Sequence, residues 1–136
     1  MTQNAQSGST QTRTFAYDGL GRLKSESTPE TNGAASAYTF DTDATCGTSN
    51  GDLVKRADPV GNVTCYAYDS LHRVTAVTYP SGSYAAATPQ KHFVYDTATV
   101  NSVAMTNAKA RLAEAIREPA DRRSRTLGSV TRCAAR

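Results

Sequence analysis

Four aspartates recur along this chain at intervals of 23 to 28 residues, and paired carboxylates at such spacing could work as a general acid and base. Each aspartate ends a phrase of the form aromatic–x–aromatic–Asp. The four phrases are Phe15–Asp18, Tyr38–Asp41, Tyr66–Asp69 and Phe93–Asp96. Because an Asp side chain can accept the backbone N–H two residues on, this fixed place predicts a turn former. We therefore expect no catalytic residue here and no enzymatic activity.

The tyrosines of the same phrases offer a second chemistry, because exposed aromatic rings can stack on sugar rings. Tyr38 and Tyr66 are the candidates for glycan stacking. Both are strand residues of a phrase whose aromatic positions return in every unit, and this favours cross-strand packing over ligand binding. We expect packing, with glycan binding as the alternative.

The cysteines and histidines could supply metal ligands, but their spacing does not match a metal site. Cys46, Cys65 and Cys133 form no CxxC pair, and His72 and His92 stand 20 residues apart. The chain also carries no phosphate-binding or nucleophile-elbow motif. We expect no metal and no cofactor. The cysteines are expected to be isolated, partly buried thiols, with a Cys46–Cys65 disulfide as the alternative in an exported protein.

The elements that must position these residues follow from the repeat itself. A phrase that returns every 20 to 50 residues is typical of repeat architectures, in which each unit packs on its neighbours. In the clearest unit, 58–62 has turn chemistry, 63–68 is rich in strand formers, 69–72 is the next turn and 73–79 is the return strand. The sequence therefore predicts an all-β fold of antiparallel β-hairpin repeats in a curved sheet.

The turns require particular residues. A residue with positive φ must precede each return strand, and Gly21 and His72 hold that place. Arg22, Arg73 and Arg111 follow, and we expect each to bond a nearby carboxylate or carbonyl and to cover a tyrosine ring. The residues that define the repeat are Tyr17, Asp18, Gly21, Arg22, Phe40, Asp41, Tyr68, Asp69, Arg73, Tyr95, Asp96 and Arg111.

Short and long hairpins alternate along the chain. The turns after Asp18 and Asp69 are short, whereas those after Asp41 and Asp96 are long. The register of the repeats makes Lys109–Ile116 the last return strand, although the helix propensity of 107–118 is high. We predict a strand, because tertiary context often overrides propensity.

Charge and composition divide the chain into three parts. Residues 1–13 are polar and expected to be disordered, 14–116 hold four hairpin repeats, and 117–136 form a basic tail expected to be disordered or weakly helical. The net charge of +3 comes from the tail, since 1–116 hold nine Lys and Arg against ten Asp and Glu. This predicts no nucleic-acid stripe, and no apolar run suits a signal peptide or membrane span. The open ends of such a sheet predict self-association.

The phrases Tyr68–Val74 and Tyr17–Leu23, with the turn Asp58–Asn62, resemble the YD repeat of the RHS family. The resemblance covers 14–116 and implies a β-sheet that spirals into a hollow shell. Such shells enclose or present a C-terminal toxin domain in bacterial competition, and carbohydrate binding by the repeats is the alternative role. The implied partners are further repeats or the toxin domain, and the implied location is secreted or on the cell surface.

The chain also departs from the family pattern. It has four repeats where a closed shell needs many more, and Asp58–Gly61 continues as an ordinary turn instead of the family's autoprotease motif. No catalytic residue therefore transfers from the family. The pattern stops after Ile116, and we interpret 117–136 as an out-of-frame or eroded segment.

Overall fold

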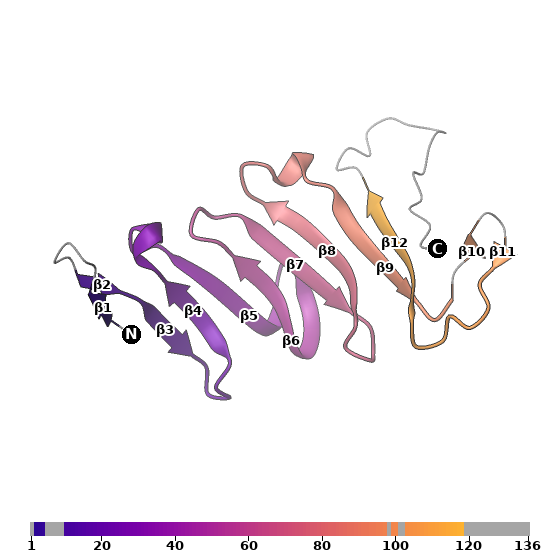
Figure 1. Ribbon diagram of the computed structural model, residues 1–136, viewed down its shortest axis with the longest axis horizontal. Helices are drawn as coiled ribbons and strands as arrows, with labels where there is room; N and C mark the ends of the chain where they lie inside the picture. Colours follow the sequence, from indigo (N-terminus) through magenta and orange to yellow (C-terminus); the bar gives the residue numbers. More distant parts are fainter. Residues whose placement is uncertain (1, 5–9, 98, 101–102, 119–136) are drawn as a thin grey trace.

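The computed structural model describes residues 2–4, 10–97, 99–100 and 103–118, and its main element is an open, eight-stranded antiparallel sheet (Figure 1). The strands lie side by side in the order β12-β9-β8-β7-β6-β5-β4-β3, so neighbours in the sheet follow one another along the chain. They are β3 (Thr14–Tyr17), β4 (Leu23–Ser27), β5 (Ala35–Asp43), β6 (Gly47–Ala57), β7 (Val63–Tyr68), β8 (Val74–Ser81), β9 (Gln90–Tyr95) and β12 (Leu112–Glu118). The all-β prediction is confirmed.

The sheet consists of four hairpins. They are hairpin I (β3–β4), hairpin II (β5–β6), hairpin III (β7–β8) and hairpin IV (β9–β12). Because alternate strands of an antiparallel sheet run the same way, the aromatic–Asp phrases all lie at the same end of the strands. The other end of the strands holds the connections between hairpins: η1 (Pro29–Thr31), the turn Asp58–Asn62 and η2 (Ala85–Ala87).

Each hairpin carries a β-bulge next to its aspartate. Tyr17 pairs with Leu23 while Ala16 pairs with Ser25, so one residue of the return strand has no partner. The same step recurs in hairpins II, III and IV. The unpaired residues are Lys24, Val54, Thr75 and Ala113. Since a bulge bends a strand and increases its twist, this repetition curves the sheet by similar steps.

Two further strand pairs lie outside the main sheet. β10 (Thr99–Val100) pairs with β11 (Val103–Ala104) inside the long loop of hairpin IV, and Figure 1 places this pair beyond β12. β1 (Thr2–Asn4) pairs with β2 (Thr10–Thr12) ahead of hairpin I. The described part of 1–13 thus differs from the expected disorder, because its Thr and Gln residues form a short ladder.

The last return strand begins and ends later than predicted. β12 runs over Leu112–Glu118, whereas the repeat register predicts 109–116. Ala110 has a φ of 61°, so the chain is still turning at this residue and cannot yet pair in a ladder. The choice of strand over helix holds. The remainder of the predicted basic tail, 119–136, lies outside the described residues.

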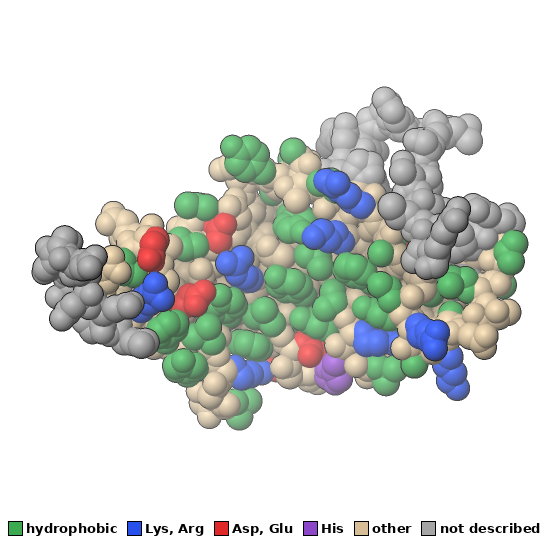
Figure 2. All heavy atoms as spheres, in the orientation of Figure 1, with side chains coloured by type: hydrophobic (Ala, Val, Ile, Leu, Met, Phe, Trp, Pro, Cys, Tyr) green, Lys and Arg blue, Asp and Glu red, His purple; other side chains and the backbone are tan. Residues whose placement is uncertain are grey.

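The core of this single-layer sheet is thin. Val54 is 1% exposed and Cys65 is 5% exposed, and both lie on the central strands β6 and β7. Figure 2 shows hydrophobic side chains gathered over the middle of the visible face, with charged side chains among them. The described residues form no helix with the length and apolar character needed to cross a membrane.

Candidate functional site: the joints between hairpins

The short turns of hairpins I and III are built by their aspartates. The Oδ1 atom of Asp69 accepts the backbone N–H groups of Leu71 and Arg73, at 2.9 and 3.0 Å. The Asp69 N–H donates to the carbonyl of Arg73 at 3.0 Å, which closes the loop. His72 has a φ of 59°, the left-handed conformation that its place in the turn requires. Asp18 makes the same contacts with Leu20 and Arg22, and Gly21 has a φ of 78°.

A third turn repeats this geometry at the other end of the strands. Asp58 accepts the N–H groups of Val60 and Asn62, and the Asn62 side-chain amide donates to Asp58 Oδ2 at 2.6 Å. Asn62 thus stands where the other two turns have arginine. This bond of the Asn62 side chain stays within its own turn, whereas an arginine at this place is long enough to bond a neighbouring hairpin as well.

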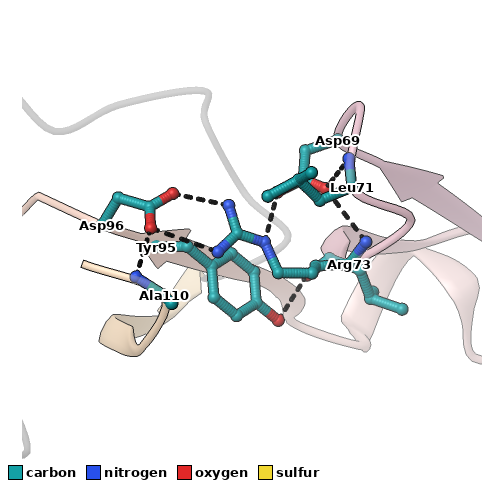
Figure 3. A network of polar contacts seen from close by, with 7 residues as sticks. Asp69, Leu71, Arg73, Tyr95, Asp96 and Ala110 are labelled. Carbon is teal, nitrogen blue, oxygen red and sulfur yellow. Dashed lines mark hydrogen bonds and ion pairs between the residues drawn. The ribbon is translucent and has the colours of Figure 1, made fainter. Parts of the chain in front are cut away.

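Arg73 joins hairpin III to hairpin IV (Figure 3). Its Nε–H donates to Asp69 Oδ2 at 2.7 Å, within its own turn. Its two terminal nitrogens donate to the two carboxylate oxygens of Asp96 at 3.3 and 2.6 Å. The planar guanidinium lies 4.4 Å from the centre of the Tyr95 ring. One arginine therefore holds its own turn, the next carboxylate and the next aromatic ring.

Arg22 makes the same set of contacts between hairpins I and II. Its Nε–H donates to Asp18 at 2.7 Å, and its terminal nitrogens donate to Asp41 at 3.2 and 2.7 Å. Its guanidinium lies 4.4 Å from the centre of the Phe40 ring. We call each of these bidentate contacts an Arg–Asp fork. The recurrence of the fork after two hairpins makes a pair of hairpins the true structural unit.

Asp41 and Asp96 differ from the turn formers that the sequence predicts. Their φ angles are 68° and 67°, and each carboxylate bonds the arginine of the preceding hairpin. Asp41 instead accepts the N–H of Gly51 at 2.7 Å, and Asp96 accepts that of Ala110 at 2.7 Å. These donors lie 10 and 14 residues away, which is why local turn rules missed them.

The charges of the forks favour the ionised carboxylates. The Arg22 guanidinium, followed by the Gly51 N–H, lowers the pKa of Asp41 to about 2. The Arg73 guanidinium likewise lowers the pKa of Asp96, and bonds from Arg73 lower that of Asp69. A depressed pKa means that the carboxylates of these forks carry their charge at neutral pH and would serve poorly as proton donors.

The second aromatic of each phrase adds another contact between hairpins. The Tyr68 hydroxyl donates to the Leu53 carbonyl at 2.8 Å, and the Tyr95 hydroxyl donates to the Val74 carbonyl at 3.0 Å. Each acceptor is the return-strand residue that pairs with the second aromatic of its own hairpin, Leu53 with Phe40 and Val74 with Tyr68. Phe40 holds the same place without a hydroxyl, and Tyr17, at the first hairpin, is 60% exposed.

The joint between hairpins II and III lacks an Arg–Asp fork. Asp52 stands where hairpins I and III have arginine, and its Oδ2 lies 2.7 Å from the Nδ1 of His72. A bond from Ser49, followed by that of His72, lowers the pKa of Asp52. Asp52 was not singled out from the sequence, although its place directly before Leu53 was the available signal.

A disulfide between Cys46 and Cys65 links hairpin II to hairpin III, with the two Cα atoms 5.1 Å apart. The tip of hairpin II reaches the face of the sheet that carries Cys65 and its cross-strand neighbour Lys55, whose ammonium bonds Asp43 at 2.9 Å. The expectation of isolated thiols is therefore wrong for this pair, because the hairpin tip folds over β7. Cys133 lies outside the described residues.

The two tyrosines considered for glycan stacking are engaged within the sheet. The Tyr38 hydroxyl donates to Glu26 at 2.6 Å, and Tyr66 faces Val77 across the ladder of hairpin III. Both are half-buried. The most exposed tyrosine is instead Tyr84, at 77%, which lines an open groove of about 220 Å³. The other residues that line this groove are Asn62, Val63, Thr64, Tyr79, Ser81, Ala85 and Thr88.

One stretch of the chain matches a known protein family. Residues 48–84 match the family model described as RHS Repeat. The chain carries an RHS repeat. The matched stretch begins in β6, contains the turn Asp58–Asn62 and all of hairpin III, and ends at Tyr84. It therefore holds Tyr68 of the joint between hairpins II and III, and Asp69 and Arg73 of the joint between hairpins III and IV. None of the curated proteins matches the chain.

Arg111 differs from the other two arginines that precede return strands in the RHS repeats. Its carbonyl accepts the N–H of Asp96 at 3.1 Å, and its own N–H donates to Ala108, so its backbone closes the long loop. Its side chain is exposed and makes no hydrogen bond or ion pair within the described part of the chain, contrary to the sequence-based expectation. In Arg22 and Arg73 that bond goes to the next hairpin along the chain.

Proposed function

We propose that this RHS-repeat chain is a wall segment of a larger β-shell. Further hairpins continue the wall, and the shell encloses or presents a C-terminal toxin domain in bacterial competition. The segment has a mechanical role and performs no catalysis. Its arginines, aspartates and tyrosines hold hairpins together, and no metal or cofactor takes part.

The observation that carries this proposal is the constant step from one hairpin to the next. Ser25 pairs with Ala37, Lys55 with Cys65, and Ala76 with His92. In each pair the first residue lies two places after the residue that faces the second aromatic of its own hairpin, and the second lies four residues before its aspartate. A wall that curves evenly needs this invariance, because any slip of one residue would turn the buried face outward.

The disulfide supports a location outside the reducing cytosol. Disulfides such as Cys46–Cys65 form and persist in oxidising compartments. We propose that the segment is exported as part of a larger protein and acts in secreted form or at the cell surface. Alkylation of free thiols in intact producing cells tests this: protection of both cysteines supports export, and their labelling contradicts it.

Protease protection tests the wall directly. The complete reading frame around these residues is expressed, and the domain that follows the repeats is followed during limited proteolysis. We expect that domain to survive in the parent protein and to be digested once Arg22 and Arg73 are both replaced by Ala. Equal digestion in parent and variant, or a reading frame without further aromatic–x–aromatic–Asp hairpins, would show the proposal to be wrong.

A second candidate function, glycan binding at the cell surface, is favoured by one observation. The exposed Tyr84 lines the open groove, where Thr64, Ser81 and Thr88 supply polar groups. Tyr38 and Tyr66 do not fit this role as well, since both are half-buried in the sheet. Binding to a glycan array that is lost in Tyr84→Ala and kept in Tyr66→Phe would support it, and an array without signal would exclude it.

A further inference from the structure

The main sheet ends at both sides in a strand with one neighbour. Among the described residues, the outer edges of β3 and β12 pair with no other strand of the sheet. Five of the nine large hydrophobic side chains that are exposed lie at these two ends. They are Phe15 and Tyr17 at the β3 end, and Val103, Met105 and Leu112 at the β12 end. Both ends thus carry exposed apolar side chains at a strand with one neighbour in the sheet, and such strands can pair with another chain.

The internal joints show what each end lacks. Inside the sheet, Tyr68 and Tyr95 donate to the carbonyl of the return-strand residue that pairs with the second aromatic of the preceding hairpin. Leu112 pairs with Tyr95 and is that residue on β12, and it is 52% exposed. Tyr17 holds the tyrosine place on β3, and it is 60% exposed. One end therefore carries the acceptor of this joint and the other end carries the donor.

We propose that β12 of one copy of this chain pairs with β3 of a second copy, head to tail. The register follows from the internal joints. In each of them, the residue two places after the partner of the second aromatic faces the residue four places before the next aspartate. Applied to the two ends, this step sets Glu114 opposite Thr14 of the second copy. The Tyr17 hydroxyl of that copy then donates to the Leu112 carbonyl.

The absence of an Arg–Asp fork at this contact follows the internal pattern. The joint from hairpin II to hairpin III also lacks a fork. There the Asp69 carboxylate bonds Leu71 and Arg73 within its own turn. Asp18 is occupied in the same way by Leu20 and Arg22. A joint from hairpin IV to hairpin I of a second copy is therefore of the same kind as that from II to III.

A contact between two different surfaces of the same chain does not close on itself after two copies. It adds copies one after another, to give either a ring or a growing filament. The expected behaviour is a mass that rises with concentration, without a fixed dimer. This inference is independent of what an RHS shell encloses.

Site-specific crosslinking of the full chain tests the register. In a Cys133→Ser background that keeps the Cys46–Cys65 disulfide, Thr14→Cys and Glu114→Cys are made separately and then mixed under oxidising conditions. Directly opposite residues of paired strands lie close enough to crosslink. We expect a crosslinked dimer in the mixture and none in either variant alone. Phe15→Cys mixed with Glu114→Cys is the matched control, because Phe15 lies on the other face of β3 and should give little product.

Sedimentation of Tyr17 variants supplies the second readout. Tyr17→Phe removes one hydrogen bond and should weaken self-association about fivefold, with no change in the thermal transition. Tyr68→Phe removes the same bond inside the sheet and should leave association unchanged while it lowers the thermal transition. A parent chain that stays monomeric at every concentration overturns the proposal. Equal crosslinking in the Thr14 and Phe15 mixtures overturns it too, since that result would mean unspecific aggregation.

Discussion

Arg73 and Asp96 stand 23 residues apart in the chain, yet the guanidinium of one donates through both terminal nitrogens to both carboxylate oxygens of the other. The pair lies where hairpins III and IV meet, and Arg22 with Asp41 forms its counterpart between hairpins I and II. In a sheet whose core is thin, such side-chain joints at the turns supplement the backbone ladder. Each of the predictions below concerns one type of joint.

Acid should weaken the joints. The pKa of Asp41 is lowered to about 2 from an ordinary value near 3.8, so its ionised form is favoured in the folded chain. A depressed folded pKa contributes stability that is complete above the unfolded value and is lost as pH falls from about 4 to about 2. The urea midpoint measured across this range should therefore fall. Asp41→Asn should show a shallower fall, and an equally steep one would contradict the assignment.

The tyrosine hydroxyls should each stabilise the sheet modestly. Tyr68→Phe and Tyr95→Phe each remove a hydrogen bond to a backbone carbonyl and should lower the unfolding free energy by about 1 kcal/mol. Phe40→Tyr is the reciprocal variant, because it adds a hydroxyl at the place that faces Leu23. A gain in stability is expected for this variant in denaturant unfolding. A loss there would mean that the hairpin I–II joint differs from the other two.

The variants Gly51→Ala and Ala110→Gly should change the unfolding free energy in opposite directions. Both donate an N–H to the aspartate of an Arg–Asp fork at 2.7 Å, and both have positive φ, 88° and 61°. Gly51→Ala should cost about 1 kcal/mol, and since an added Cβ meets nothing within 4 Å the cost is conformational. Ala110→Gly should gain roughly 0.5 kcal/mol, since relief of strain exceeds the added freedom of the unfolded chain. Thermal unfolding of the two variants measures both signs.

Loss of the disulfide should release the tip of hairpin II. Cys46 and Cys65 close a loop with a sequence separation of 19, and removing such a link costs about 3 kcal/mol of unfolding free energy. We expect Cys46→Ser to lower the denaturant midpoint and reduction of the parent to have a similar effect. Cys133→Ser keeps this disulfide and is the matched control. A parent chain indifferent to reductant would contradict this assignment.

The sequence reveals the local half of each joint and misses the distant half. The turns at Asp18 and Asp69 follow from hydrogen bonds that span two to four residues, and turn rules predict them. The forks to Asp41 and Asp96 depend on how hairpins pack, since their partners lie 19 and 23 residues away. What signalled them was only the recurrence of arginine before each return strand.

The disulfide and the start of β12 were not predicted from the sequence, for related reasons. Spacing alone does not show that the tip of hairpin II folds over β7, and that fold is what brings Cys46 to Cys65. The repeat register suggested a strand from Lys109, but a left-handed Ala110 that donates to Asp96 delays it to Leu112. In both cases the residues inserted between the aspartate and the return strand decide the outcome, and contacts that such insertions make with distant strands follow no local pattern.

A double-mutant cycle on Arg73 and Asp96 tests most directly whether side-chain forks join the hairpins of this sheet. Unfolding free energies are measured at low salt for Arg73→Gln, Asp96→Asn and the double variant, beside the same cycle for Arg73 with Asp41. For Arg73 with Asp96, we expect the double variant to lose clearly less unfolding free energy than the sum of the two single losses. For Arg73 with Asp41, we expect the losses in unfolding free energy to be additive. Additivity in both cycles would mean that the fork does not hold hairpins III and IV together.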